Sequence, residues 1–487
     1  MILPADIEAV IESLRSEVAA LRSEVVELRH ENAALRAENA ALRAENAELR
    51  RRLDQDSSTS SKPPSSDGLK KKPRILGSLR GPSDKASGGQ PGHKGDTLRK
   101  VDEPDRIVEH AAWTCRHCRG PLTAAMRAGE ETRQVFDLPE RLVEVTEHRA
   151  AIYACAHCRG RTRADFPADV TAPAQYGPRF RAAAVYLNLQ QLIPEDRVAQ
   201  TMADLFGAAR FCPMSLTRWV EAWARAFEPV GARIAALASN APVRCLDETG
   251  FRVAGRNHWL HTVATETLTL YRVSKKRGDL PRDLVGGVIV HDGLKGYYGL
   301  SGHRHALCNA HHLRELKAII DFDGETWAEP MRDLLLEAHR AVEEARKRGE
   351  PNLPDQVADA FKARYWEALR LGLSHHRKLP RLPRHPSNQG KTRRRPGHNL
   401  LIRLHRFKDD VPRFIDDFDV PFTNNLAEQA LRMMKVKMKV SGTFRTLDAA
   451  KDFAALRSIV ASARKRGWNI LKTLTSQPQA LVNALET

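Results

Sequence analysis

PVRCLDETGFRV, at residues 242–253, is the stretch around which this chain is organised. The run HWLHTVATETLTLYRV follows it at 258–273, and GGVIVHDGLKGYYGL follows at 286–300. Short runs of apolar, β-branched and aromatic residues bounded by turn residues are typical of buried strands. We therefore expect strands in all three stretches, with the first apolar run turning through residues 248–250 and the last one ending at Asp292.

A carboxylate lies at the end of the first and of the last apolar run, at Asp247 and Asp292. Because Mg²⁺ prefers oxygen ligands from carboxylates and water, this pair predicts a divalent-cation site. The two residues also have an ordinary structural explanation, since Asp-Gly is a hairpin signal and Asp-x-Thr-Gly favours an Asx-turn. The residues around them leave both explanations open.

Length and charge narrow the class of protein. A chain of 487 residues is expected to form two to four domains. Its formal net charge of +18 favours a polyanionic partner, with nucleic acid as the first candidate. No apolar run reaches the roughly 18 residues that a membrane span needs, and the charged N-terminus lacks a secretory core. We therefore expect a cytoplasmic protein that binds DNA and no membrane.

Residues 11–53 repeat with a period of seven. The d positions hold leucine at Leu14, Leu21, Leu28, Leu35, Leu42 and Leu49. The a positions hold Ile11, Val18 and Val25, and then Asn32, Asn39 and Asn46. Leucine at d with β-branched a residues favours two strands, and asparagine at a fixes the register. Glutamate at g and arginine at e complete the pattern of a parallel homodimeric coiled coil over residues 1–53.

A linker rich in Ser, Pro, Gly and Lys follows at residues 54–105 and has too few apolar residues to build a core. Its basic residues, among them Lys70, Lys71 and Lys72, are either a solvated spacer or an arm that contacts DNA phosphates. The two explanations are compatible.

Residues 106–172 contain two matched Cys-x-x-Cys pairs, at Cys115 and Cys118 and at Cys155 and Cys158, each followed by Arg-Gly. Two such knuckles predict a structural Zn²⁺ site with four sulfur ligands. Residues 135–154 alternate enough to be the strands of a zinc ribbon. A disulfide or redox pair is the alternative, but the knuckles are matched and no βαβ pattern surrounds them.

Residues 173–240 show helical periodicity. We expect one helix to end at Gly207 and the next to begin with Ser215 as its N-cap. Two helices joined in this way fit a helix-turn-helix, in which the second helix reads DNA, and a plain helical hairpin equally well.

A cysteine and two histidines lie close together at Cys308, His311 and His312, in the sequence CNAHHLREL. They resemble metal ligands, but the sequence supplies no fourth ligand nearby. Packing, or a histidine that faces DNA, is the simpler explanation.

Residues 321–415 predict a helical insertion, and residues 374–408 within it hold eleven Lys or Arg and no acid. This one-sided charge predicts a phosphate-binding surface that includes Arg393, Arg394 and Arg395.

A third carboxylate, Glu428, lies at the start of a helix in residues 416–487. A capping box with Asn425 is a complete structural explanation for this glutamate. The functional alternative places Glu428 opposite the two aspartates, with Arg432 and Lys435 further along the same side of the helix to hold phosphate. Strands carrying Asp247 and Asp292, followed by a helix carrying Glu428, give the order found in ribonuclease-H-like nucleotidyl transferases.

Several long motifs resemble those of the transposases of the insertion sequence 66 family. They are the cysteine knuckles, STSSKPPSSDG at 58–68, GGQPGHKG at 88–95, LDETGFRV at 246–253, HDG at 291–293, CNAHHLREL at 308–316, TNNLAEQALR at 423–432 and SGTFRTLDAAKDFAALRS at 441–458. One position departs from the family, which often has an aromatic residue where Asn309 follows the cysteine. We do not expect this difference to affect catalysis.

The resemblance implies an Asp-Asp-Glu transposase with Asp247, Asp292 and Glu428 as both catalytic residues and ligands of Mg²⁺ or Mn²⁺. Its partners would be the terminal repeats of a bacterial insertion sequence, target DNA, a second copy of the chain and, in some systems, small accessory proteins of the same element. The expected fold is multidomain α+β, with a ribonuclease-H-like core formed by residues 241–320 and 416–487. We expect the protein to be nucleoid-associated when it is bound to DNA. The competing hypothesis is a dimeric zinc-containing DNA-binding protein without catalysis, either a regulator or an inactive transposase relic.

Overall fold

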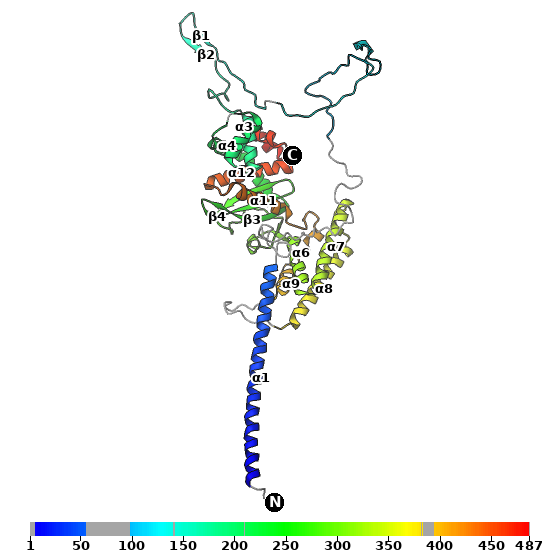
Figure 1. The fold of residues 1–487 in the computed structure, drawn as a ribbon. Coiled ribbons are helices and arrows are strands. Elements are labelled where there is room, and N and C mark those ends of the chain that lie inside the picture. The colour runs from blue at the N-terminus through cyan, green and yellow to red at the C-terminus, as the bar shows by residue number, and fades with distance from the viewer. Residues whose placement is uncertain are drawn as a thin grey trace.

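A computed structural model describes residues 5–54, 98–139, 142–208, 210–380, 382 and 394–486. The predicted DNA contacts Lys70, Lys71, Lys72 and Arg393 lie outside these residues. Figure 1 shows a central α/β body, a long helix that extends away from it and an elongated segment at the opposite end.

A five-stranded mixed sheet forms the centre of the protein. Its strands are β3 (Val243–Val253), β4 (Arg256–Ala264), β5 (Thr269–Ser274), β6 (Val288–His291) and β7 (Arg304–Leu307). Their spatial order is β5-β4-β3-β6-β7. The pairs β3·β4 and β4·β5 are antiparallel, whereas β3·β6 and β6·β7 are parallel. The three stretches expected to form strands do form them.

The expected turn after Asp247 is wrong, because β3 continues to Val253. Glu248 and Thr249 pair with β4, and their side chains are buried. The chain reverses at Ala254 and Gly255, whose φ angles are 47° and 76°. A two-residue hairpin with positive φ at both positions matches the twist of its strands, so the turn belongs at this pair and not at residues 248–250.

The sheet separates two apolar cores. On β6, Ile289 belongs to one core, and its neighbours Val288 and Val290 belong to the other, as the alternation of a strand requires. The first core includes residues of six helices: α2 (Pro178–Leu189), α3 (Glu195–Phe206), α4 (Pro213–Ala226), α5 (Glu228–Asn240), α11 (Asn425–Ser441) and α12 (Leu447–Lys465). Two short helices, α13 (Ile470–Thr475) and α14 (Pro478–Ala484), complete it. Helix α11 packs on β3 and β4, and α12 packs on β5 (Figure 1).

The second core joins the sheet to α6 (Asn309–Ala318) and to the insertion. The insertion comprises η4 (Ile319–Asp323), α7 (Ala328–Lys347), α8 (Asp355–Lys378), α9 (Pro396–Arg406) and α10 (Arg413–Asp416). The predicted helical character of this region is confirmed. A short turn, η3 (Lys295–Gly299), connects β6 to β7.

The helices before the sheet confirm one predicted boundary and correct another. Gly207 ends α3 in the left-handed conformation, with φ 67°, as predicted. Ser215 does not cap α4, which begins at Pro213 with Cys212 in the N-cap position. Proline suits the first turn of a helix because the backbone N–H that it lacks has no partner there, so the helix begins earlier than predicted.

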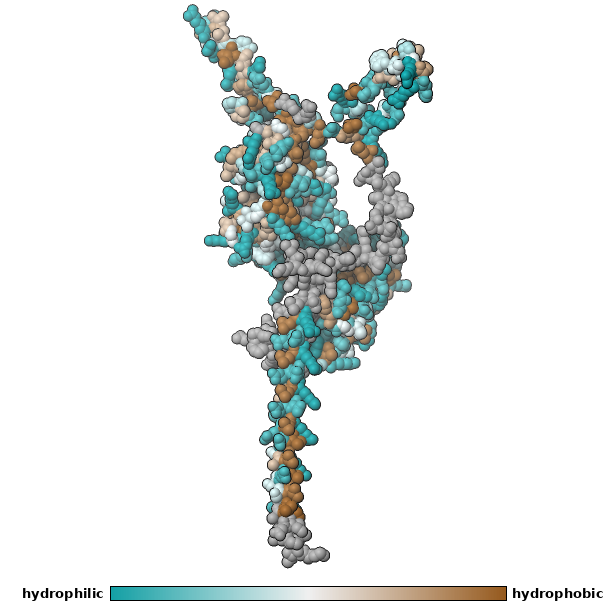
Figure 2. Space-filling view, viewed as in Figure 1, coloured by the Kyte–Doolittle hydropathy of each residue, from teal (hydrophilic) through white to brown (hydrophobic). Residues whose placement is uncertain are grey.

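Helix α1 (Ala5–Asp54) is a single rod of 50 residues. Its six d-position leucines are each 48% to 54% exposed. Figure 2 shows apolar side chains following one side of the rod. Within the described ranges, no helix is both long enough and apolar enough to cross a membrane.

Candidate active site

The register of the parallel strands places Asp247 beside Asp292. Cys245 on β3 pairs with Val290 on β6, and each aspartate follows two residues later. Side chains two residues apart share a face of the sheet, and neighbouring strands are about 4.8 Å apart. The two aspartates therefore lie on adjacent parallel strands, Asp247 in the middle of β3 and Asp292 directly after the end of β6.

The electrostatics of Asp247 bring in further carboxylates. Burial is the main cause that raises the pKa of Asp247, to about 8. The negative charges of Glu248 and Asp292 add to this rise, and Glu428 adds a smaller contribution. A carboxyl group raised in this way holds its proton at neutral pH unless a cation compensates the charge. Asp292 and Glu428 thus both lie within electrostatic reach of Asp247.

Asp292 also makes a local turn, because its Oδ1 accepts a hydrogen bond of 2.9 Å from the backbone N–H of Leu294. This is an Asx-turn, although the sequence pattern indicated such a turn at Asp247 and a hairpin at Asp292. The Asp-Gly pair does not form a hairpin, since β6 is parallel to both of its neighbours. The turn engages one oxygen of an otherwise exposed carboxylate.

Glu428 lies in the first turn of α11, and the predicted capping box with Asn425 is wrong. The N-cap residue is Asn424, and its side chain makes no capping bond. Instead, Asn424 Nδ2 donates to the carbonyl of Leu246 at 2.8 Å, across 178 positions of sequence. This bond ties the start of α11 to β3 directly beside Asp247.

Cys308 and His311 approach the same oxygen of Glu428. Cys308 Sγ donates to Oε1 at 3.6 Å, and His311 Nδ1 lies 3.9 Å from Oε1. Burial raises the pKa of the Cys308 thiol to about 12. Within the described part of the chain, these three residues are the one group of potential metal ligands whose atoms lie within 4.8 Å of one another.

The expectation of packing holds for His312 but not for His311. His312 is buried, and its Nδ1 lies 3.1 Å from Asn309 Oδ1. The side chain of Asn309 also donates to the carbonyl of Val411 at 3.0 Å, which gives this departure from the family a structural role. Glu428, 120 positions after Cys308, is the neighbour that the sequence did not reveal.

Glu248, the residue after Asp247 on β3, is the centre of a buried polar network. The Glu248 side chain is only 1% exposed. Its Oε1 accepts from Arg277 Nε and Nη2 at 2.9 and 2.7 Å, and its Oε2 accepts from the hydroxyl of Tyr297. The Arg277 guanidinium stacks on Trp259 at 5.1 Å. Sequence reasoning missed this network, because only the folded sheet brings Arg277 and Tyr297 to Glu248.

The predicted phosphate-binding residues lie on two elements. Arg432 is exposed and Lys435 half-buried on α11, the helix that carries Glu428. Arg394 and Arg395 immediately precede α9 in the insertion, where Arg395 Nη1 donates to the carbonyl of Pro380 at 2.9 Å. Only the first pair therefore shares an element with a predicted catalytic residue.

The two cysteine knuckles have the same local geometry. In each, the first cysteine N–H donates to the glycine carbonyl five residues on, at 2.9 Å for Cys115 and 2.8 Å for Cys155. Arg119 and Arg159 both adopt φ 59°. Backbone N–H groups, first those of Cys118 and Cys158, lower the pKa of Cys115 and Cys155 respectively.

The structure does not gather the four sulfur atoms into one cluster, although all four cysteines are described. Figure 1 shows β1 (Ile152–Ala154) and β2 (Arg161–Arg163) well apart from the segment before them. In the described residues of this range, 135–139 and 142–154, the prediction of ribbon strands is wrong except for the last three residues. The described residues from 98 to 151 contain only an isolated bridge and the short turn η2 (Ala124–Met126). Apolar side chains in this segment are exposed, so no core fixes the strands.

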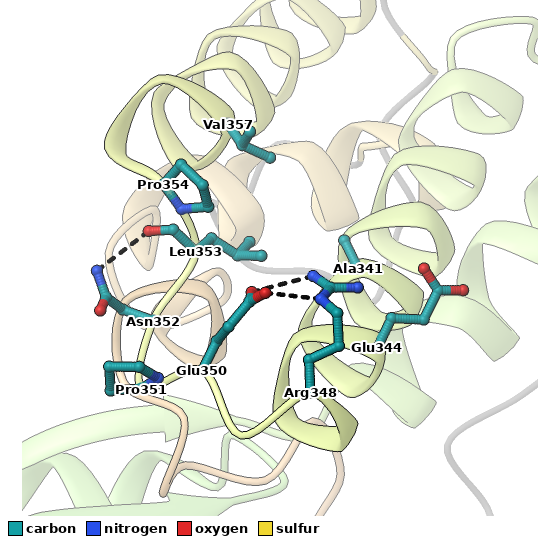
Figure 3. A pocket seen from close by; sticks show the side chains of 9 residues that line it. All are labelled: Ala341, Glu344, Arg348, Glu350, Pro351, Asn352, Leu353, Pro354 and Val357. Atoms are coloured by element: carbon teal, nitrogen blue, oxygen red, sulfur yellow. Dashed lines mark hydrogen bonds and ion pairs between the residues drawn. The ribbon is translucent and has the colours of Figure 1, made fainter.

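A surface hollow of about 530 Å³ lies at the corner between α7 and α8, and it is lined by neither the carboxylates nor the cysteines described above. Figure 3 shows Arg348 and Glu350 facing each other in it, joined by bonds of 2.6 and 3.0 Å. None of its lining residues is a predicted site residue. It is therefore not part of the candidate active site.

Comparison with known families agrees with the motifs. Residues 173–452 match the family described as transposase IS66 family, and residues 113–159 match the zinc-finger binding domain of transposase IS66. Residues 2–99 match a family of unknown function. No curated protein matches the chain.

A match over more than half of the chain defines the class of protein as a transposase. The chain belongs to the transposase IS66 family, which confirms the resemblance seen in the motifs. The zinc-finger match supports a structural Zn²⁺ and DNA as a partner.

Proposed function

We propose that the chain cleaves DNA at the ends of its own mobile element and joins those ends to target DNA, with Asp247, Asp292 and Glu428 as the catalytic triad. The observations that support this proposal are the parallel register of β3 and β6, which brings Asp247 and Asp292 to adjacent strands, and the Asn424 bond that ties the start of α11 to β3. Burial is the main cause of the raised pKa of Asp247, and the negative charges of Asp292 and Glu428 add to it. Such mutual repulsion is compensated when divalent cations bind.

The strand order supports a ribonuclease-H-like core. Three antiparallel strands are followed by two strands parallel to the first, in the order β5-β4-β3-β6-β7. Within the five-stranded sheet, Asp247 lies on the first strand in sequence order and Asp292 follows the fourth, and Glu428 comes from a helix after the insertion. This is the order expected of Asp-Asp-Glu transposases.

The donor set fits Mg²⁺ or Mn²⁺, because the triad offers only carboxylate oxygens. When bound, two such ions activate the attacking oxygen and stabilise the leaving oxygen of an in-line displacement. Asp247 and Asp292 would hold them from adjacent strands, and Glu428 from the start of α11. Arg432, one helical turn beyond Glu428, would hold a DNA phosphate next to the reacting one. A water molecule attacks first, and the freed 3′-hydroxyl then attacks target DNA.

The other parts of the chain would bind and pair the DNA ends. Cys115, Cys118, Cys155 and Cys158 would hold Zn²⁺, since each knuckle directs two thiols with matching geometry and metal binding can draw small domains together. The exposed leucine stripe of α1 supports a parallel homodimeric coiled coil, which brings two ends together by symmetry. The helices α3 and α4 supply the candidate helix-turn-helix. This activity places the protein at the DNA in the cytoplasm.

The test is cleavage of labelled duplex DNA carrying the element's own terminal repeats. We expect cleavage by the unchanged protein with Mg²⁺ and none by Asp292→Ala, with binding to the ends preserved. Equal cleavage by both proteins would refute the triad. Binding without any cleavage by the unchanged protein would favour the competing hypothesis of a non-catalytic DNA-binding protein.

A further inference from the structure

Cys308 contacts both the backbone and the side chain at the start of α11. It follows β7 directly, occupies the N-cap position of α6 and is 1% exposed. Its Sγ accepts a hydrogen bond from the Asn424 N–H at 3.1 Å and donates to Glu428 Oε1 at 3.6 Å. One sulfur atom therefore fixes both the position of the helix and the direction of its carboxylate.

His311 is placed on the same oxygen. Its Nδ1 is buried and has no hydrogen-bond partner, a state that is costly for a polar atom. The nearest acidic atom is Glu428 Oε1, at 3.9 Å. A shift of about 1 Å would bring the two atoms to hydrogen-bond distance. The side chain is thus placed to donate to Glu428 after a small shift of either residue.

Both contacts involve Oε1 of Glu428, so neither Cys308 nor His311 occupies its second oxygen, Oε2. Asn424 adds a third restraint, since its bond to the carbonyl of Leu246 holds the helix start beside Asp247. Groups that hydrogen-bond to a metal-binding side chain fix its orientation and strongly affect the affinity for the metal. Direct ligation of a soft metal by Cys308 is a different arrangement, and its sulfur already makes two hydrogen bonds inside the core.

We propose that Cys308 and His311 are positioning residues that engage Oε1 of Glu428 and so present Oε2 to the divalent cation held by Asp247 and Asp292. This inference rests on the proposed function and deepens it. Neither residue touches the reacting atoms. Both act through Glu428.

The variants separate positioning from simple packing. Cys308→Ala and His311→Leu remove the contacts with Glu428. Cys308→Ser keeps a donor and an acceptor at the same place, and His311→Asn keeps an N–H near the position of Nδ1. Cys245→Ala is the matched control for a buried cysteine, and His312→Leu is the control for a histidine on the same helix, since no hydrogen bond links either control residue to Glu428.

The first measurement is the affinity of the full-length protein for Mn²⁺ in the absence of DNA, determined by electron paramagnetic resonance. Cys308→Ala and His311→Leu should weaken binding by about 10- to 100-fold, as expected for groups that orient a metal ligand. Cys308→Ser and His311→Asn should recover most of the affinity. Cys245→Ala should bind Mn²⁺ like the unchanged protein even where its melting temperature falls.

The second measurement is the Mg²⁺ concentration that gives half-maximal cleavage of terminal-repeat DNA. It should rise in Cys308→Ala and His311→Leu and return towards the original value in the conservative variants. Unchanged metal dependence in both disruptive variants would overturn the inference, as would a second zinc ion per chain that is lost with Cys308. If Asp292→Ala binds Mn²⁺ like the unchanged protein, the proposed function fails by itself, whatever the cysteine variants show.

Discussion

Two groups of predicted metal ligands are supported in different ways in this protein. Asp247, Asp292 and Glu428 come from distant parts of the sequence and are brought within electrostatic reach. The four cysteines at residues 115–158 are close in sequence. In the described part of the chain, neither these cysteines nor the three carboxylates have ligand atoms that all lie within 4.8 Å of one another. The carboxylates are supported by a sheet between two apolar cores, whereas the cysteine segment exposes its apolar side chains. A packed core can hold like charges together, but a small segment without a core depends on its metal.

The largest expected effect is on the carboxylates. Glu428→Gln should lower the rate of DNA cleavage by at least about a thousandfold, which corresponds to about 4 kcal/mol of transition-state stabilisation. The reason is that an amide replaces a charged metal ligand without changing the shape of the side chain. Cleavage assays at saturating Mg²⁺ test this. Zinc content should be unchanged, and residual cleavage within tenfold of the original, by the same scale, would contradict the triad.

Substitutions in the cysteine knuckles should affect zinc content and DNA binding and leave the carboxylate site unchanged. Cys115→Ser with Cys118→Ser should remove zinc and weaken binding to terminal repeats by about 10- to 100-fold, since one finger contributes only part of a DNA interface. Elemental analysis and a mobility-shift titration measure the two effects. Mn²⁺ binding at the carboxylates should stay the same.

Cys212→Ser is the matched control, because Cys212 is an exposed cysteine outside the knuckles. Full zinc content in the double variant would show that the knuckles do not hold the metal.

The predicted coiled coil of α1 extends the comparison to a region whose apolar stripe is exposed. Leu21→Glu with Leu28→Glu should convert a dimer into a monomer, because both d-position side chains are exposed on α1 and would meet a partner chain. Sedimentation analysis measures the change. Val26→Glu is the control, since Val26 is 64% exposed but lies outside the a and d positions. Dimers that persist in the double variant would place the interface elsewhere.

The smallest expected effect is on the pH dependence of stability. The pKa of Asp247 rises from 3.8 to about 8 on folding, so between these values the folded protein holds a proton that the unfolded chain releases. The free energy of unfolding of the metal-free protein therefore falls as pH rises. Asp247→Asn should remove this decline and raise the melting temperature more at pH 8 than at pH 5, by a few degrees.

Asp283 provides a control of opposite sign. Its side-chain hydrogen bonds from Arg272 lower its pKa, so its contribution to stability is present above the ordinary pKa of an aspartate and is lost as pH falls. Asp283→Asn should lower the melting temperature at pH 7. If Asp247→Asn and the unchanged protein have the same melting temperature at every pH, folding does not raise the pKa of Asp247.

The sequence by itself determined the parts of this protein that depend on local pattern. Strand-forming runs, the helix end at Gly207, the heptad repeat of α1 and the family motifs all follow from residue types at short spacing. Local rules failed where two signals competed. The Asp-x-Thr-Gly signal at Asp247 was overruled by burial of Phe251 and Val253, and the capping signal at Asn425 was overruled by the bond from Asn424 to β3.

Only the tertiary structure decided which residues meet at the candidate active site. The parallel register of β3 and β6 sets Asp247 beside Asp292, and the packing of α11 on the sheet brings in Glu428. Cys308, His311, Arg277 and Tyr297 then join through contacts that span tens to more than a hundred positions. No periodicity within one segment encodes such contacts, because they depend on how two cores fill the two faces of one sheet.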